Sequence, residues 1–408
     1  QKKTNSRKQS KMPTQRFGAK QLSNQLYMAN VKGAGMARPL GEPDRSDVRL
    51  WADIMTSDSL TGVSIVDRCG LIEMPYNFKV YEPFRMPMDL SGASYTYEQC
   101  CQRRAQELLD LSDRLNKPLY VCYSGGIDST MMLVSFLKQR NITRLREQLY
   151  VVMTPDSINE YPLFYKKYIR ENLRYVTGEK LSTYFDGKKI IVGGEHNDQL
   201  FGTDLVDKLV RVVDIDRVFE PYSRDFLVKY LTSCGATATS SLTVPEASAN
   251  WWYDMLSWHA SKAPCEIRSN FDLLWWFNFC FRWQTVYFRM LLRIDSELMN
   301  RVDDQFVQDH FHHFYSTEDF QRWSMLNPQL KIRNNNWNDY KFHAKDLIFN
   351  YTGDSVYRDN KIKRRSLFRL FIGKDTPDGL SSSYEYLYNI DREEFYNPNN
   401  SFKNNYGT

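Results

Sequence analysis

The sequence contains no pair of cysteines spaced as Cys-x-x-Cys, and its number of cysteines is odd. Seven cysteines are spread over 408 residues, and no secretory signal peptide is visible. Disulfide-stabilised secreted domains and structural zinc sites depend on paired or clustered cysteines, so the sequence argues against both classes. We therefore predict reduced thiols and a cytoplasmic location.

The sequence also has no long apolar run that is free of charge. Its most apolar stretch, Phe271–Arg293, contains Asp272, Arg282 and Arg289. A membrane-spanning helix needs about 20 consecutive, predominantly apolar residues. The stretch therefore predicts a buried helix, and we expect no membrane partner. Hydrophobic residues make up 42% of the chain, which is enough for one large or two ordinary domains.

Acidic residues are absent from residues 1–20, where seven basic side chains occur. A run of this kind is typical of a solvated arm, and docking on an acidic partner or on nucleic acid stays open. The formal net charge of the whole chain is only +5, which by itself does not indicate a nucleic-acid-binding protein. Homo-oligomerisation also stays open, because nothing in the composition decides it.

Short apolar runs alternate with helical segments in the middle of the chain, and a mostly helical, aromatic region covers residues 251–352. The predicted buried strands are Leu119–Cys122, Gln148–Thr154 and Lys189–Val192. The predicted helices around them are Thr96–Asn116, with Thr96 as its N-cap, and Pro162–Tyr175. This alternation predicts an α/β fold with a doubly wound parallel sheet, and a ligand site at the carboxyl ends of its strands.

The stretch Pro118–Thr130, PLYVCYSGGIDST, connects the first of these strands to a helix through two glycines. Glycines let backbone N–H groups approach an anion, and a helix N-terminus adds partial positive charge, so this arrangement favours phosphate binding. The loop lacks the lysine of a GxxxxGK[ST] loop, and Asp128 lies inside the turn. A carboxylate repels phosphate, so Mg²⁺ is expected between the two.

The pattern SGGxDS at residues 124–129 resembles the PP-loop signature of the ATP pyrophosphatases, which cut ATP between its α and β phosphates. The resemblance implies an adenine nucleotide alpha hydrolase-like sheet and an ATP site. The residues expected to cradle phosphate are Ser124, Gly125, Gly126 and Ser129. The strand-end residues expected to meet adenosine, mainly through backbone groups, are Cys122, Met153, Gly193 and Gly194.

A second motif, Gly193–Gly202 (GGEHNDQLFG), is similar to the GEGSDELFGG of asparagine synthetases and the related β-lactam-forming synthetases. Asp128 and Asp198, each at a strand end, are expected to share Mg²⁺ that bridges the ATP phosphates. Glu195 is expected to face the same cleft, where a carboxylate could act as general base on an incoming amine.

A third match lies far downstream, in Phe314–Ile332 and Asp339–Tyr351. Aligned with the same family, Lys341 takes the place of the lysine that contacts the leaving phosphates and the acyl-adenylate. Lys345 takes the place of the family's arginine. An ammonium group at that position would stabilise the charge that develops on pyrophosphate.

The resemblance implies an AMP-forming ligase that adenylates a carboxylate and then forms an amide with ammonia or another amine. No cysteine precedes Cys69, so we expect no glutaminase domain. The alternatives are a pyrophosphatase that modifies a nucleobase or tRNA, and a non-catalytic assembly protein with the same fold. We divide the chain into a basic arm with a small leader, in which β structure is expected from residues 63–66 to residues 78–81 (together residues 1–95), the asparagine synthetase-like domain (96–370) and a polar tail (371–408).

Overall fold

The computed structural model describes residues 20–22, 25–28, 67–71, 86–177, 181–202, 206, 216–234, 246–288 and 304–361. The β segments predicted at residues 63–66 and 78–81 of the leader, and the polar tail, lie outside these ranges. Within the leader, β1 (Lys20–Leu22) and β2 (Gln25–Met28) pair antiparallel.

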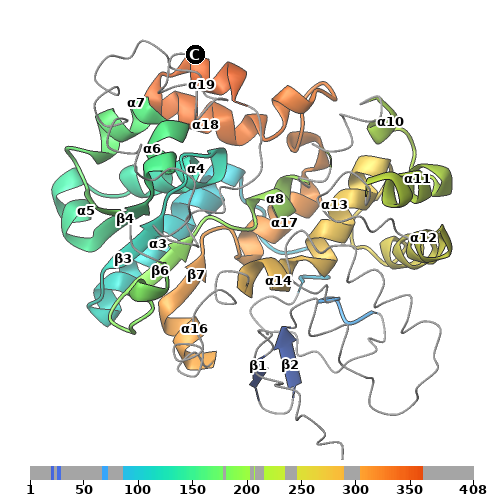
Figure 1. The fold of residues 1–408 in the computed structure, drawn as a ribbon, viewed down its shortest axis with the longest axis horizontal. Coiled ribbons are helices and arrows are strands. Elements are labelled where there is room, and N and C mark those ends of the chain that lie inside the picture. Colours follow the sequence, from blue (N-terminus) through green and yellow to red (C-terminus); the bar gives the residue numbers. More distant parts are fainter. Residues whose placement is uncertain are drawn as a thin grey trace, which may run out of the picture.

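A five-stranded, all-parallel sheet forms the centre of the described structure (Figure 1). Its strands are β3 (Leu119–Cys122), β4 (Leu149–Met153), β5 (Arg174–Thr177), β6 (Ile190–Gly193) and β7 (Phe311–His313). They lie in the order β5-β4-β3-β6-β7, so the predicted α/β class with a parallel sheet is confirmed. The chain moves outward from β3 on one side and from β6 on the other. In open α/β sheets, ligands bind at such a reversal, outside the carboxyl ends of the strands.

The register of the central strands brings their carboxyl ends to one level. Leu119 pairs with Leu149 on one side and with Ile190 on the other. All four residues of β3 and of β6 are buried, as expected for strands covered on both faces. The loops that follow β3, β4 and β6 therefore open at the same edge of the sheet.

Helices surround this sheet and extend beyond it. In chain order they are α3 (Tyr97–Leu115), α4 (Ile127–Leu137), α5 (Ile142–Gln148), α6 (Pro155–Glu160), α7 (Pro162–Phe164), α8 (Asn197–Phe201), α10 (Asp216–Phe219), α11 (Arg224–Cys234), α12 (Glu246–Ala260), α13 (Asn270–Phe281), α14 (Trp283–Phe288), α16 (Asp304–His310), α17 (Glu318–Leu326), α18 (Phe342–Thr352) and α19 (Ser355–Asn360). Short π or 3₁₀ turns are η2 (Tyr165–Ile169), η3 (Leu181–Tyr184), η5 (Pro328–Leu330) and η6 (Trp337–Asp339).

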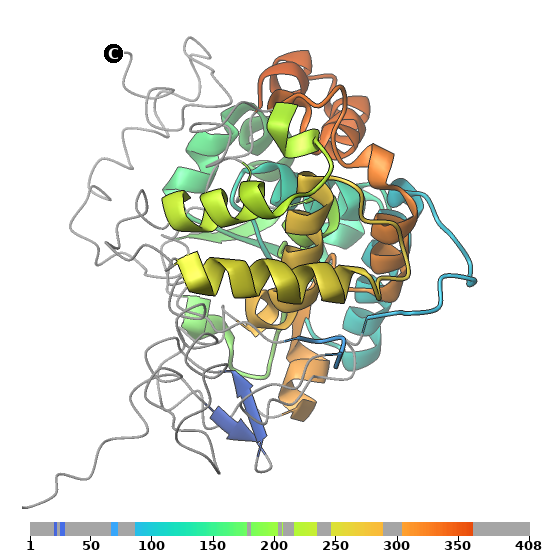
Figure 2. The same cartoon turned by 90° about the vertical axis from the view of Figure 1, so that its right-hand side faces the viewer.

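Packing places α3 and α18 against α4, the helix that follows the glycine turn. Helix α3 begins as predicted, because the Thr96 hydroxyl accepts from the Gln99 N–H (3.2 Å) and the Gln99 side chain accepts from the Thr96 N–H (2.9 Å). Helices α11 and α12 lie side by side on the side of the molecule that is remote from the sheet (Figures 1 and 2). None of the described helices is both long and apolar enough to cross a membrane.

Two strands of the five-stranded sheet, β5 and β7, were not predicted from the sequence. The helix predicted at Pro162–Tyr175 ends with η2, and its last residues belong to the edge strand β5, whose side chains are largely exposed and give no apolar run. Strand β7 lies inside the region predicted to be helical. It has only three residues and directly follows α16, so its sequence carries no period-2 signal of useful length.

Lys331 is a fully buried lysine in the helical part of the structure. Its ammonium nitrogen lies 2.9 Å from the ring centroid of Trp275 and has no hydrogen-bond partner among the described residues. Burial lowers the pKa of Lys331 from 10.5 to about 7, although Asp272 and Cys265 act in the opposite direction. The side chain is therefore largely neutral above neutral pH.

We expect Lys331→Met to raise the free energy of unfolding near neutral pH by about 1–4 kcal/mol, because a buried ammonium with no hydrogen-bond partner among the described residues is replaced by an apolar group. Between about pH 7 and 10.5 the unfolded parent binds more protons than the folded parent, so its stability increases with pH in that window. Urea titrations of both proteins across the window should show their difference shrinking as pH rises.

Lys345→Met is the matched control, because the Lys345 ammonium donates to two backbone carbonyls, Asn338 O (2.5 Å) and Lys361 O (3.1 Å). Its removal leaves those oxygens without their donor and should lower stability. If both substitutions changed the free energy of unfolding equally, the absence of hydrogen bonds to the Lys331 ammonium would not be the reason that this lysine destabilises the protein.

Candidate functional site

The two glycine turns meet at the reversal between β3 and β6. A Cβ on Gly194 would lie 3.6 Å from the backbone nitrogen and Cα of Ser129, which are in the first turn of α4. Gly125 has φ +77°, and a Cβ there would overlap Ser157 O and lie 2.6 Å from Glu160 Cβ. A residue with a Cβ does not fit at position 125, so this conformation of the turn requires glycine.

Hydrogen bonds within the first turn hold it in place. The Ser129 hydroxyl accepts from the Ser124 N–H (3.1 Å) and lies 3.0 Å from the Ser124 hydroxyl. Gly126 is the N-cap of α4 and provides no side chain to bond the N–H groups of its first turn. Those N–H groups, together with the helix dipole, form a position suited to an anion.

The ammonium group of Lys341 lies between Asp128 and Asp198. Its Nζ is 2.6 Å from Asp128 Oδ1 and 2.7 Å from Asp198 Oδ1. The lysine side chain is fully buried, whereas the two carboxylates remain 17% and 20% exposed. The structure therefore brings together three residues predicted from separate motifs, and both carboxylates converge on one cationic group.

A hydrogen-bonded chain orients this ion-pair cluster. Asn197 donates to Asp128 Oδ1 (2.7 Å) and accepts from the Tyr97 hydroxyl (2.9 Å). The Tyr340 hydroxyl donates to Asp198 Oδ1 (3.4 Å). Sequence reasoning missed Asn197, although it lies inside the second motif, between the two acidic residues. It missed Tyr97 and Tyr340 because a tyrosine in an aromatic-rich sequence gives no functional signal.

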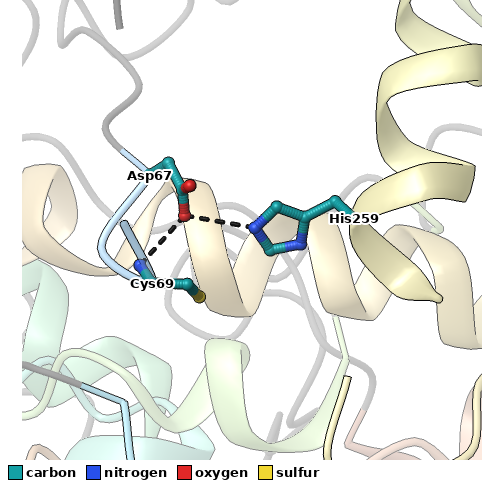
Figure 3. A group of neighbouring side chains, drawn as sticks. All are labelled: Asp67, Cys69 and His259. Carbon is teal, nitrogen blue, oxygen red and sulfur yellow. Dashed lines mark hydrogen bonds and ion pairs between the residues drawn. The ribbon is translucent and has the colours of Figure 1, made fainter. Parts of the chain in front are cut away.

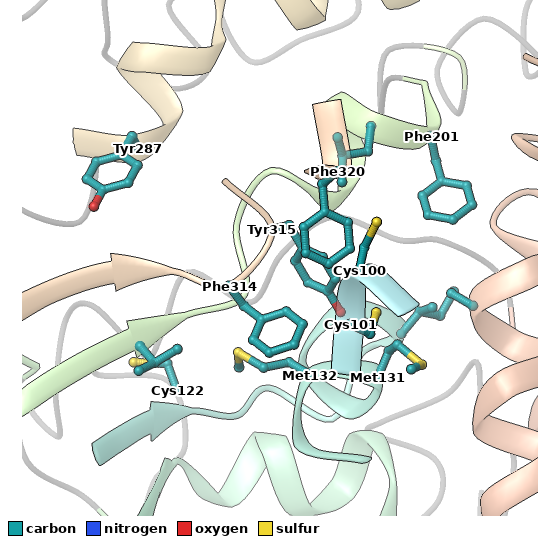
Figure 4. Close-up of a cluster of buried hydrophobic side chains, with 14 of the residues drawn as sticks. Cys100, Cys101, Cys122, Met131, Met132, Phe201, Tyr287, Phe314, Tyr315 and Phe320 are labelled. Atoms are coloured by element: carbon teal, nitrogen blue, oxygen red, sulfur yellow. The ribbon is translucent and has the colours of Figure 1, made fainter. Parts of the chain in front are cut away.

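A cluster of buried side chains packs around α4 and the end of β3 (Figure 4). The labelled side chains belong to β3, α3, α4, α8, α14, α17 and the turn after β7: Cys122, Cys100, Cys101, Met131, Met132, Phe201, Tyr287, Phe320, Phe314 and Tyr315. Tyr315 also donates its hydroxyl to the main-chain oxygen of Asp128 (2.7 Å). The position of Asp128 is thus fixed through both its backbone and its side chain.

The donor set fits a Mg²⁺ ion. Mg²⁺ in phosphate-transfer sites is usually bound by one or two carboxylates together with substrate phosphates. Asp128 and Asp198 offer such carboxylates beside the glycine turn, and the Lys341 ammonium already marks the point on which both converge. Mg²⁺ binding at this point requires the ammonium group to move or to share the carboxylates.

The remaining predicted residues lie around the same strand ends. Glu195 follows β6 and is close enough to Cys122 for its charge, added to the larger effect of burial, to raise the pKa of that thiol to about 12. The side chains of Cys122 and Met153 are buried, so only their backbone groups are available to a ligand. The carbonyl of Gly193 accepts from the Phe314 N–H (2.8 Å).

His196, next to Glu195, has a structural position. It is buried with φ +77°, and its Nε2 lies 2.8 Å from Trp283 O. A carbonyl oxygen only accepts hydrogen bonds, so Nε2 carries a proton. The imidazole therefore connects the second motif to α14 and does not offer Nε2 as a base.

Two further lysines lie near the cluster in different roles. Lys345 bonds backbone carbonyls, as described above, and burial lowers its pKa to about 8. The hydrogen bonds of its ammonium thus go to backbone carbonyls, whereas the resemblance made Lys345 the counterpart of a family arginine. Lys361 is buried and forms an ion pair with Glu160, whose Cβ faces Gly125. Lys361 is thus connected to the glycine turn through Glu160.

Comparisons with protein-family models, with curated proteins and with solved structures found no match for this chain. The functional interpretation therefore depends on the sequence motifs and on the geometry of the site.

We expect Lys341→Met to make the protein respond to Mg²⁺ in the absence of nucleotide. Removing the ammonium leaves two facing carboxylates, which repel each other and attract a divalent cation. A ligand present at ten times its Kd stabilises the folded state by about 1.4 kcal/mol. Thermal unfolding with and without MgCl₂ should show a rise in Tm for the variant and a much smaller one for the parent.

Lys345→Met serves again as the control, because it removes a buried ammonium that does not contact the carboxylates. If Mg²⁺ shifted the Tm of the parent and of both variants equally, the cation would not be binding between Asp128 and Asp198.

Proposed function

We propose that this chain is an ATP-dependent, AMP-forming ligase that joins a carboxylate to ammonia or another amine. The observation that carries the proposal is the convergence of Asp128 and Asp198 on one cationic position beside the SGG turn. This position lies at the strand-order reversal, where nucleotides bind in open α/β sheets. The resemblance of the first motif to ATP pyrophosphatases and of the second motif to asparagine synthetases supports the same reaction class.

In this proposal the glycine turn holds the ATP phosphates. The first-turn N–H groups of α4 and the hydroxyls of Ser124 and Ser129 face the phosphates, while Gly125 and Gly126 allow their close approach. Backbone groups after β3, β4 and β6 surround adenosine. Mg²⁺, when bound by Asp128 and Asp198, neutralises part of the phosphate charge.

The reaction proceeds in two steps. A carboxylate oxygen of the acid attacks the α phosphorus, the bond to the β phosphate breaks, and pyrophosphate leaves. The nitrogen of the amine then attacks the carbonyl carbon of the acyl-adenylate, and AMP leaves with the electron pair of the broken C–O bond. Hydroxide is a poor leaving group, so activation by AMP makes the amide bond accessible.

Lys341 and Glu195 have separate roles in these steps. The Lys341 ammonium is buried and close to the phosphate turn, where it stabilises the negative charge that develops on pyrophosphate. Glu195 accepts the proton that the amine nitrogen must lose during attack. The buried Asn197 keeps Asp128 oriented throughout.

ATP–pyrophosphate exchange tests the proposal without knowledge of the amine. The purified chain, Mg²⁺ and ATP are incubated with labelled pyrophosphate and a panel of carboxylic acids, and label in ATP is measured. The proposal predicts exchange that depends on one class of acid. Exchange that depends on a nucleobase or tRNA would favour the alternative pyrophosphatase chemistry, and release of ADP and phosphate would contradict both.

We expect Asp128→Asn and Asp198→Asn each to abolish exchange while the protein stays folded. Each change removes one negative ligand from a site that depends on two, and so weakens charge neutralisation in the transition state. Asp110→Asn, an exposed change on α3, is the control and should exchange normally. Exchange at the parent rate in either site variant would contradict the metal assignment.

We expect Glu195→Gln to separate the two steps. If Glu195 is the base, exchange stays within about tenfold of the parent, whereas amide formation falls by roughly 10²–10⁴. Both rates are measured with the same acid, by label exchange and by mass spectrometry of the amide. A parallel loss of both would instead make Glu195 a residue that positions ATP or Mg²⁺, and two unchanged rates would remove it from the mechanism.

A further inference from the structure

A second group of reactive side chains lies where the segment 67–71 contacts the end of α13. The Arg68 N–H donates to Cys280 O (3.3 Å), so the backbones of Cys69 and Cys280 run next to each other. Figure 3 shows Asp67, Cys69 and His259 facing one another at this contact. None of these residues belongs to the nucleotide site described above.

The two thiols occupy one sulfur-rich position. Cys69 Sγ lies 3.8 Å and Cys280 Sγ 3.9 Å from the sulfur of Met86. Cys280 is also close enough to Cys69 to lower the pKa of the Cys69 thiol. Cys69 is half-buried whereas Cys280 is fully buried, so an external reagent reaches Cys69 first.

Both ring nitrogens of His259 take part in hydrogen bonds, which leaves neither nitrogen available as a metal ligand. The Trp276 indole N–H, which can only donate, bonds His259 Nδ1 (2.9 Å). Nδ1 therefore has no proton, and Nε2 carries one that it shares between Asp67 Oδ1 (3.2 Å) and the sulfur of Cys69. A protonated Nε2 has no lone pair for a metal, and metal-binding histidines usually donate from their other nitrogen.

The surroundings favour the thiolate form of Cys69. The hydrogen bond from Cys280 is the largest effect, followed by burial in the opposite direction and by a hydrogen bond from His259, and together they lower the pKa of Cys69 to about 7. The charge of Arg68 acts in the same direction and that of Asp67 against it. Burial instead raises the pKa of Cys280, which stays a thiol. Redox-sensitive cysteines typically have a low pKa, are accessible to the oxidant and lie next to a second thiol.

We propose that Cys69 and Cys280 form a peroxide-sensitive dithiol, in which Cys69 is oxidised first and Cys280 resolves it to a disulfide. The disulfide would join the segment 67–71 covalently to α13. The proposal concerns a modification site and does not depend on the ligase activity.

The chemistry balances with hydrogen peroxide as the oxidant. The Cys69 thiolate attacks one peroxide oxygen, the O–O bond breaks, and hydroxide leaves, which gives Cys69 sulfenic acid. The sulfur of Cys280 then attacks the sulfur of the sulfenic acid, the S–O bond breaks, and water leaves after taking up the Cys280 proton. The two thiols lose two electrons in total, and the peroxide is reduced by two.

The test is peroxide titration of the reduced, full-length protein, followed by intact mass and non-reducing peptide mapping. The expected result is a mass loss of two hydrogen atoms and one linked peptide that contains Cys69 and Cys280. Cys280→Ser should abolish the link and leave Cys69 with added oxygen. A Cys69 that acquires oxygen in the parent without the link would overturn the proposal.

Alkylation of the unmodified parent provides a second measurement that needs no variant. Cys265 is also half-buried, but burial raises its pKa to about 11, so it is the matched control. At neutral pH iodoacetamide should modify Cys69 about 10²–10³-fold faster than Cys265 because far more of it is thiolate. Equal rates, or a stoichiometric metal ion that protects Cys69 until a chelator removes it, would contradict the proposal.

Discussion

The candidate site depends on one interaction, the burial of the Lys341 ammonium between Asp128 and Asp198. Two carboxylates at neighbouring strand ends would otherwise repel each other. A buried ion pair is favourable only when its geometry is good and its remaining hydrogen-bonding groups are satisfied, and Asn197 and Tyr340 meet that need here. The interaction joins the starts of α4, α8 and α18, so the site is assembled by segments far apart in the sequence.

The motifs predicted much of this arrangement because each lies directly after an apolar strand. Parallel strands bring their carboxyl ends to one edge, so Asp128 and Asp198 could be expected near each other. The glycine at position 125 is required by a positive φ and a close contact, which SGG spacing anticipates. Lys341 was predicted only through a family resemblance, since neither periodicity nor spacing connects it to residues so far upstream.

Other parts of the structure could not be predicted from the local sequence. The edge strand β5 is largely exposed and β7 has three residues, so their pairing is decided by tertiary contacts. Asn197 and Tyr97 become important only because the fold brings them together, and the same holds for Cys69 and Cys280. Lys345 matched a family position, yet its ammonium bonds backbone carbonyls, which no alignment reveals.

The central claim is that the cluster of Asp128, Asp198 and Lys341 is a site for Mg²⁺ and ATP. It is tested most directly by calorimetric titration with α,β-methylene-ATP, which cannot be cut between the α and β phosphates. The account predicts binding of one nucleotide per chain that requires Mg²⁺ and is competed by pyrophosphate. Absence of binding, or equal binding after chelation of all divalent cations, would contradict it.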